Sequence, residues 1–375
     1  MILPPPEIHV TDVLAYFNCR RAWAWQSRLR AGLEPMKPHR PFVMGTAYHH
    51  AMEQLYQPNG DAAGRALGAI APVFEKALRE YSATDGIVDD STLEGLKADQ
   101  ELCEQMVLNY AAWARTVDDD WEVIDTEREL RFPIATSEGG SRWWVCSENE
   151  DAVDFVLSMR IDGVTIHKPT STLWLREYKT ARSIPEEETK ITKSLQHRVY
   201  AWGAEQTVHR PIAGVEYRFA RKAAPQFPRK LNSGKVSVAL TGEGEYTTPM
   251  TFRVAYEMYA GRKWPDDGQP PAEYVGHYAA LVQREKEGQF FKVLPVQKTS
   301  VELTTAIDTV VAAAMEMLDE HTSIYPMPHP LGFNCNSCLF RAPCDRLDAG
   351  LDADFLLRNE YRPRRPSVRR ETNEQ

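Results

Sequence analysis

The sequence predicts a mixed α/β fold with a helical N-terminal segment and a helical insertion in its core. Three observations predict it. Before residue 120, apolar side chains recur mainly at helical spacing. Residues 121–178 then carry β-branched and aromatic residues in partial alternation. Strand-like and helix-like segments alternate after that, and strands bracketed by helices in this way are typical of a mixed sheet in one core.

The part before residue 120 is expected to consist of amphipathic helices. In residues 10–29, Val13, Leu14 and Phe17 recur at helical spacing, and Thr11 is placed to cap the helix. Further helices are expected at 45–56, 61–81 and 92–117. We therefore expect residues of about 60–120 to form the helical insertion.

The strands and the remaining helices follow. Strands are expected at 121–132, 143–146, 153–166, 173–178, 215–220 and 290–296, and helices at 189–205, 273–286 and 301–320. The turn-prone Lys168-Pro169-Thr170-Ser171 stretch predicts a hairpin between the third and fourth strands. Residues 1–355 are expected to form one domain, and the Arg-rich residues 356–375, interrupted by Pro363 and Pro366, a flexible tail.

Composition limits the class of protein. No stretch is apolar for long enough to span a bilayer, and the Pro-rich start lacks a secretion signal, so we expect a cytoplasmic protein without a membrane partner. The net charge of −9 argues against a protein that coats nucleic acid, although a DNA enzyme needs only local basic patches. Such patches occur at 20–30, 218–230 and 358–370, and a solvated surface is the alternative for each.

An acidic pair lies on the predicted hairpin. Asp162 is on its first strand and Glu177 on its second, so the two carboxylates can lie side by side. Two carboxylates so placed repel each other unless a cation such as Mg²⁺ lies between them. Lys179 projects from the same face as Glu177, where it can orient a water or stabilise charge on a phosphate.

An ordinary surface hairpin with scattered charges is the alternative for this triplet. The flanking residues argue against this alternative. The apolar run 173–175 leads directly into charged residues, and charged groups at the end of a buried strand cost free energy unless a functional site requires them. Asp154 is a second candidate for the first carboxylate, but its distance from Glu177 along the chain fits less well.

Four cysteines form a candidate metal site. Cys335, Cys338 and Cys344 follow the spacing C-x2-C-x5-C, and Cys19 on the first helix is the candidate fourth ligand. The spacing leaves zinc and an iron–sulfur cluster open. Cys103 and Cys146 lie in a predicted helix and a predicted strand, and we expect them to be core cysteines.

Two tryptophans of the first helix lie near basic residues. Trp23 and Trp25 can stack on single-stranded bases beside Arg20, Arg21 and Arg28. Packing of the helix is the alternative, and we favour it for Trp25.

The acidic motif resembles the core of the RecB-like branch of PD-(D/E)XK nucleases, and three parts of the sequence agree with this family in order and spacing. They are Asp162 with Glu177-Tyr178-Lys179-Thr180, the Gly45-x-x-x-His49 helix with Glu53, and Gln196 with Tyr200. The register of the family selects His49 rather than its neighbour His50. One departure is that Ile161 stands where the family motif has proline.

The resemblance implies a restriction-endonuclease-like core and a set of site residues. His49, Asp162, Glu177 and the backbone carbonyl of Tyr178 would bind Mg²⁺ or Mn²⁺, and the metal would activate a water for attack on a phosphodiester. Lys179 would hold that water or the phosphate. Gln196 and Tyr200 would lie beside the active site on the following helix.

The cysteines are similar to the iron staple of CRISPR-associated RecB-like exonucleases. This resemblance implies that Cys19, Cys335, Cys338 and Cys344 hold a [4Fe–4S] cluster, with zinc as the alternative occupant. Arg20 follows the first cysteine here, where proline is more usual.

The function implied is a DNA exonuclease that acts on single-stranded or end-bearing duplex DNA in phage-type recombination, repair or DNA processing. A recombinase, a helicase or an integrase is the partner it suggests, in the cytoplasm of a bacterial host if the gene is carried by a phage. A helicase would be a separate chain, because no Gly-x-x-x-x-Gly-Lys-Ser/Thr motif occurs. The alternatives are a CRISPR spacer-acquisition nuclease and a catalytically silent DNA-binding scaffold.

Overall fold

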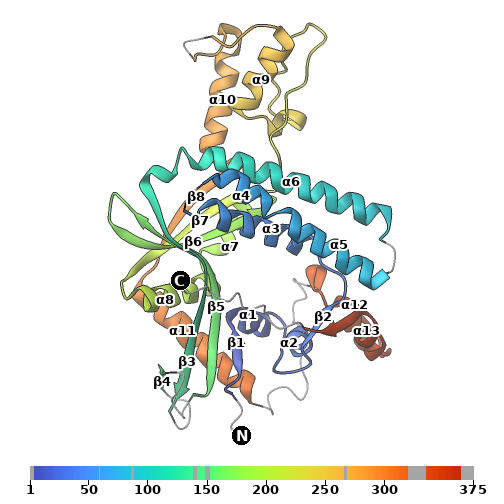
Figure 1. The fold of residues 1–375 in the computed structure, drawn as a ribbon, viewed down its shortest axis with the longest axis vertical. Helices are drawn as coiled ribbons and strands as arrows, with labels where there is room; N and C mark the ends of the chain where they lie inside the picture. The colour runs from blue at the N-terminus through green and yellow to red at the C-terminus, as the bar shows by residue number, and fades with distance from the viewer. Residues whose placement is uncertain are drawn as a thin grey trace.

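The computed structural model describes residues 4–58, 60–85, 88–137, 142–147, 153–265, 268–319 and 335–364. A seven-stranded mixed sheet forms its centre, in the order β4-β3-β5-β6-β7-β8 with β1 beside β5 (Figure 1). Its strands are β1 Glu7–His9, β3 Trp121–Thr136, β4 Trp143–Val145, β5 Phe155–His167, β6 Thr172–Ala181, β7 Ile212–Arg221 and β8 Phe291–Gln297. The predicted mixed α/β fold is confirmed.

The β5–β6 hairpin brings the two predicted acidic residues together. Its antiparallel ladder runs from the pair His167 and Thr172 to the pair Gly163 and Arg176. Asp162 and Glu177 are the next residues on the two strands, so they lie opposite each other where the ladder ends. The turn predicted at residues 168–171 is therefore confirmed.

Helices cover both faces of the sheet. One hydrophobic cluster joins α1 (Val10–Asn18), α8 (Leu195–Val208) and α11 (Ser300–Leu318) to one face. On the other face, a second cluster joins α3 and α6 to residues of β6, β7 and β8. The helices of this second layer are α3 Arg40–Leu55, α4 Ala62–Gly68, α5 Ala71–Asp85 and α6 Asp90–Ala114 (Figure 1). They include the helices expected between residues 60 and 120.

Three of the predicted helices are interrupted. The helix expected at 61–81 is α4 and α5, divided at Ala69 and Ile70. The helix expected at 10–29 is divided at Cys19, whose extended backbone (φ −160°, ψ 108°) ends α1 and begins α2 (Arg20–Gln26). The sulfur of Cys19 accepts a hydrogen bond from the backbone N–H of Ala22 at 3.5 Å, as an N-cap does. Thr11 is not the N-cap of α1, because His9 holds that position. The helix expected at 189–205 is likewise two helices, α7 (Ile184–Ile191) and α8.

A second insertion lies between β7 and β8; the helix predicted at 273–286 is confirmed within it, whereas the helix at 249–260 was not predicted. It carries α9 (Pro249–Ala260) and α10 (Val275–Lys286), which project from the body at the top of Figure 1. Phe252, Tyr274 and Leu281 belong to its own hydrophobic cluster. The apolar residues of α9 do not follow a clear helical period in the sequence, because some of them lie on its exposed face.

The segment after residue 340 is ordered, which corrects the expectation of a flexible tail from residue 356. Helices α12 (Arg341–Asp348) and α13 (Ala353–Glu360) lead into β9 (Tyr361–Pro363), which pairs with β2 (Leu33–Pro35). The segment is held by packing as well as by charge, because Tyr361 is buried and stacks on Phe340, and Arg362 pairs with Glu34 at 2.8 Å. The rest of the predicted tail, residues 365–375, lies outside the described residues. Within the described chain, no helix has the length and apolarity needed to cross a membrane.

Candidate active site

A cleft of about 420 Å³ opens where α3, the sheet and α8 meet. It gathers residues that are more than 100 positions apart in the sequence. Its lining consists of Pro41, Phe42, Gly45, Thr46, His49, His50, Glu127, Arg160, Asp162, Glu177, Lys179, Gln196 and Tyr200. All the side chains expected in the nuclease site are thus in one cleft. The exception is Tyr178, for which only the backbone carbonyl was expected to take part, and whose side chain is buried against Tyr56 and Tyr110.

Asp162 is held by both neighbouring elements. One of its carboxylate oxygens accepts a hydrogen bond from the backbone N–H of Tyr178 at 2.8 Å. Its other oxygen lies 3.1 Å from Nδ1 of His49 on α3. The side chain thus continues the contact between β5 and β6 beyond their ladder and fixes the histidine beside the strand ends.

Glu177 is buried and only half satisfied. Its Oε1 accepts a hydrogen bond from Nζ of Lys179 at 2.6 Å and lies 3.2 Å from Nε2 of His197. Burial alone would raise the pKa of Glu177, but the Lys179 ammonium and His197 hold it well below its usual range. Its Oε2 has no hydrogen-bond partner among the described residues. A buried carboxylate oxygen without a partner is costly, and a cation would satisfy it.

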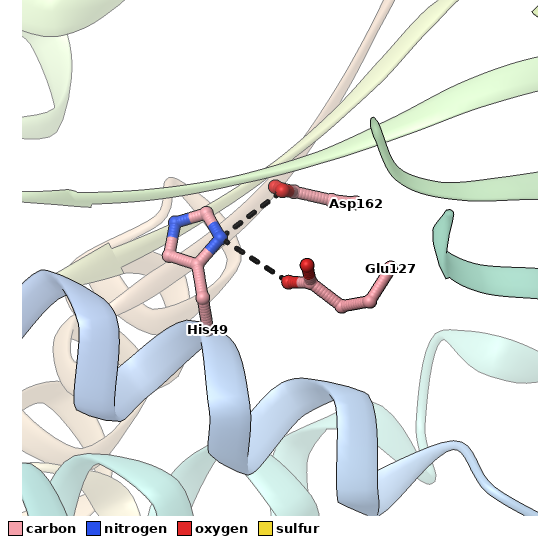
Figure 2. Close-up of side chains that lie close together, drawn as sticks. All are labelled: His49, Glu127 and Asp162. Atoms are coloured by element: carbon pink, nitrogen blue, oxygen red, sulfur yellow. Dashed lines mark hydrogen bonds and ion pairs between the residues drawn. The ribbon is translucent and has the colours of Figure 1, made fainter. Parts of the chain in front are cut away.

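Glu127 is a member of the site that the sequence analysis missed. Its Oε1 lies 3.8 Å from Nδ1 of His49, and its Oε2 lies 2.5 Å from Nε of Arg160. Ligand atoms of His49, Glu127 and Asp162 all lie within 4.8 Å of one another, and Figure 2 shows the three side chains converging. Burial, followed by the nearby Asp162 carboxylate, raises the pKa of Glu127 to about 7.

The backbone explains why Glu127 reaches the site. It has a φ of 48°, in the left-handed region that residues with a side chain rarely adopt. In a regular strand, the alternating charges of Glu127-Arg128-Glu129 would indicate a solvent-exposed edge strand. In the β3–β5 ladder Thr126 pairs with Gly163 and Arg128 with Ile161, so Glu127 falls opposite Asp162, a position that no motif in the sequence marks.

Helix α8 contributes two faces to the site. Gln196 donates a hydrogen bond from its Nε2 to the hydroxyl of Tyr200 at 3.0 Å, one turn further on, and both line the cleft. His197 lies on the inner side, where its Nδ1 is 2.9 Å from the hydroxyl of Tyr217. This second missed residue therefore connects Glu177 to the core.

The donors in the cleft suit a divalent cation. They are carboxylate oxygens and one imidazole nitrogen, of the kinds that Mg²⁺ and Mn²⁺ accept. The group of His49, Glu127 and Asp162 gives such an ion oxygen and nitrogen ligands, while Glu177, with its unpartnered Oε2, lines the same cleft outside this group. Asp154, the second candidate for the first carboxylate, instead accepts hydrogen bonds from the backbone and hydroxyl of Thr136.

The four predicted cysteines line one separate pocket. Cys19 reaches it from the start of α2, and the other three from the segment at 335–344, with the rings of Trp25 and Phe340 beside them. No three sulfurs in the described part of the chain lie within 4.8 Å of one another, so they are not gathered into a single-ion site.

Cys103 is buried in α6, and Cys146 is half-buried with its sulfur 3.6 Å from the carbonyl of Pro133. Trp23 is buried in the core, which removes it as a base-stacking candidate.

Comparison with known proteins agrees with this geometry. The family model described as the PD-(D/E)XK nuclease superfamily matches residues 8–345, which include the sheet, α3, α8 and the cysteine-bearing segments. No curated protein matches the chain. Since the family match spans nearly the whole described fold and the cleft holds the superfamily's acidic motif, the chain belongs to the PD-(D/E)XK nuclease superfamily.

Proposed function

We propose that the protein is a metal-dependent DNA exonuclease that hydrolyses phosphodiester bonds at DNA ends. The observation that carries the proposal is the cleft, where three carboxylates lie together with the His49 imidazole and the Lys179 ammonium. Membership in a nuclease superfamily supports a phosphodiester as the substrate. The choice of DNA ends follows from the resemblance to RecB-like exonucleases.

The proposed ligands of Mg²⁺ or Mn²⁺ are His49, Asp162, Glu177 and the backbone carbonyl of Tyr178, and we add Glu127. When bound, the ion supplies a water of lowered pKa and neutralises charge on the scissile phosphate. The support for Glu127 is its position within 4.8 Å of the ligand atoms of His49 and Asp162.

Lys179 and Arg160 are the cationic side chains of the cleft. Nζ of Lys179 is 2.6 Å from Glu177, so it lies next to the proposed ion and can hold the attacking water or a phosphate oxygen. The Arg160 guanidinium is about 44% exposed and can bind a neighbouring phosphate. Gln196 and Tyr200 on α8 would contact the DNA strand from the other side of the cleft.

We further propose that Cys19, Cys335, Cys338 and Cys344 hold a [4Fe–4S] cluster rather than zinc. The four cysteines line one pocket, to which Cys19 comes from one end of the fold and the other three from the opposite end. The resemblance to the iron staple supports a cluster as the occupant, and its role would be structural.

End-labelled DNA tests the nuclease proposal. Linear substrates labelled at the 5′ or the 3′ end, and a circular substrate, are incubated with Mg²⁺ or Mn²⁺ and with wild type, Glu177→Gln or Glu129→Gln. Glu129 is an exposed control on β3. We expect the wild type and Glu129→Gln to shorten linear DNA and spare the circle, and Glu177→Gln to do neither. Equal cleavage of circular and linear DNA would reject the exonuclease, and equal activity of Glu177→Gln would reject the site.

A further inference from the structure

One face of α3 separates the catalytic cleft from a second hollow. Phe42, Thr46 and His50 lie four residues apart on this face, and all three line both hollows. We call these three residues the α3 ridge. The second hollow has a volume of about 610 Å³ and reaches Val73 and Lys76 on α5.

The path continues beyond the second hollow. Pro38 and His39 line both it and a third hollow of about 810 Å³, which extends to Cys338 and Tyr361. The catalytic cleft and the two further hollows thus share lining residues in series, and the third hollow reaches the cysteine pocket at Cys338. A strand that leaves the cleft over the α3 ridge would enter this path.

Phe42 is the aromatic group on the ridge. Its side chain is 60% exposed, although burial of a phenylalanine ring is favourable. The ring of His39 packs beside it, with the ring centroids 4.8 Å apart and the planes at 58°. This contact supports one side of the ring and leaves much of the other open to a ligand.

The distance to the proposed metal fits a nucleic-acid strand. Phe42 precedes His49 by seven residues on the same helix, a rise of about 10 Å. That rise spans about one to three nucleotides of one strand, because stacked bases lie roughly 3.4 Å apart and unstacked bases lie further apart. Lys76 in the second hollow and Lys37 in the third can contact the phosphates of such a strand.

We propose that Phe42 stacks on a nucleobase of a single DNA strand that crosses the α3 ridge, close to the phosphate that is cut. The proposal rests on the proposed nuclease function and adds a base-binding position to it. Aromatic stacking accepts every base, so the contact would favour single strands without reading sequence. In a duplex the bases are stacked on each other, and one would have to be displaced to reach Phe42.

Binding without cleavage tests the proposal. A fluorescent single-stranded oligonucleotide is titrated with protein in EDTA, and anisotropy gives Kd for wild type, Phe42→Ala, Phe42→Leu, Phe42→Trp and Phe227→Ala. Phe227 is a matched control, since it is 49% exposed and lines none of the three hollows. We expect Phe42→Ala and Phe42→Leu to bind about tenfold more weakly, on the order of one stacked base, and the other variants to bind like wild type.

An abasic scan identifies the contact. Moving one abasic site along the oligonucleotide should weaken the wild type at one position, with little further loss there in Phe42→Ala, because both changes remove the same interaction. Equal binding by Phe42→Ala, full retention in Phe42→Leu, additive losses in the scan or no wild-type binding would each overturn the proposal. If the wild type shows this coupling but cleaves no DNA with Mg²⁺ or Mn²⁺, the nuclease function fails and the stacking contact stands.

Discussion

Glu127 shows at the scale of one residue how an irregular backbone places a functional group. Its φ of 48° costs free energy that the surrounding strands must offset, and such positions concentrate at functional sites. At this position its carboxylate lies beside the ligand atoms of His49 and Asp162. Strain and function are therefore coupled at this position.

Two substitutions of Glu127 separate strain from function. Both Glu127→Ala and Glu127→Gly remove the carboxylate, so both should weaken Mn²⁺ binding measured by calorimetry. Glycine adopts positive φ without steric cost, so Glu127→Gly should unfold with a free energy about 1 kcal/mol higher than Glu127→Ala. Equal stability of the two variants in urea denaturation would show that the backbone is not strained there.

His197 is the second residue whose role in the site depends on the side chains that it contacts. It lies 3.2 Å from Glu177 and 2.9 Å from the hydroxyl of Tyr217. We expect His197→Ala to reduce Mn²⁺ affinity or cleavage by about 10–100-fold, as is typical when the support of a metal ligand is lost. Gln196→Ala, one residue away, should leave Mn²⁺ affinity unchanged because the Gln196 side chain hydrogen-bonds to Tyr200 rather than to a proposed metal ligand. Unchanged metal affinity in both variants would contradict the positioning role of His197.

The sequence predicted the residues of this site that belong to motifs, and it missed those that do not. Asp162, Glu177 and Lys179 are specified by a hairpin whose alternation and turn are local properties of the chain. Glu127 and His197 enter through a non-local contact, one by a backbone irregularity and the other by packing against β7. Neither leaves a pattern in the sequence that differs from an ordinary charged strand or a core histidine.

At the scale of elements, local pattern was most reliable for the long strands of the sheet, whereas the three-residue strands β1, β2 and β9 were not predicted. Helices were predicted with the right type but were joined where the chain bends, as at Cys19, because its apolar period continues through the break. Helix α9 was missed for a related reason. Met250 and Met258 on its outer face are about two-thirds exposed, so apolar residues follow both faces rather than one.

The insertion that carries α9 and α10 gives a prediction about elements. It has its own hydrophobic cluster, and β7 and β8 remain paired up to Ala220 and Phe291 at its base. Replacing residues 223–288 by Asn-Gly should therefore leave a cooperatively folding chain whose midpoint falls by a few degrees, with the α/β circular dichroism retained. Loss of cooperative melting would show that the sheet depends on the insertion.

At the scale of the whole molecule, segments from the two ends of the fold are joined. Arg21 on α2 contacts the sulfur of Cys344 at 3.1 Å and the carboxylate of Asp348 at 2.6 Å. Together with the β2–β9 pair, these contacts place Cys19 beside the other three cysteines. The spacing of the cysteines in the sequence predicted that they form a group. The strand pair that supports this group was not predicted, because β9 lies in a segment whose composition resembles that of a flexible tail.

The proposed cluster has a direct test on the intact protein. Anaerobically purified wild type should be brown and contain about four iron atoms per chain, as expected for a [4Fe–4S] centre. Cys338→Ala should lose the iron and the colour and melt at a lower temperature, while Cys146→Ala should keep both. A colourless wild type with one zinc per chain would reject the cluster and retain the metal site.

The β2–β9 pair also has a consequence for biosynthesis. Arg362 and Glu34, which face each other across this pair, are 328 positions apart along the chain. A ribosome that adds about 5–20 residues per second would deliver the second partner roughly 15–65 s after the first. During that interval β2 has no strand to pair with, and Cys19 lacks its three companions until residues 335–344 have been added. The β2–β9 pair therefore waits until residue 363 has been synthesised, and a ribosome stalled before the cysteine segment would leave both the strand pair and the cysteine group unformed.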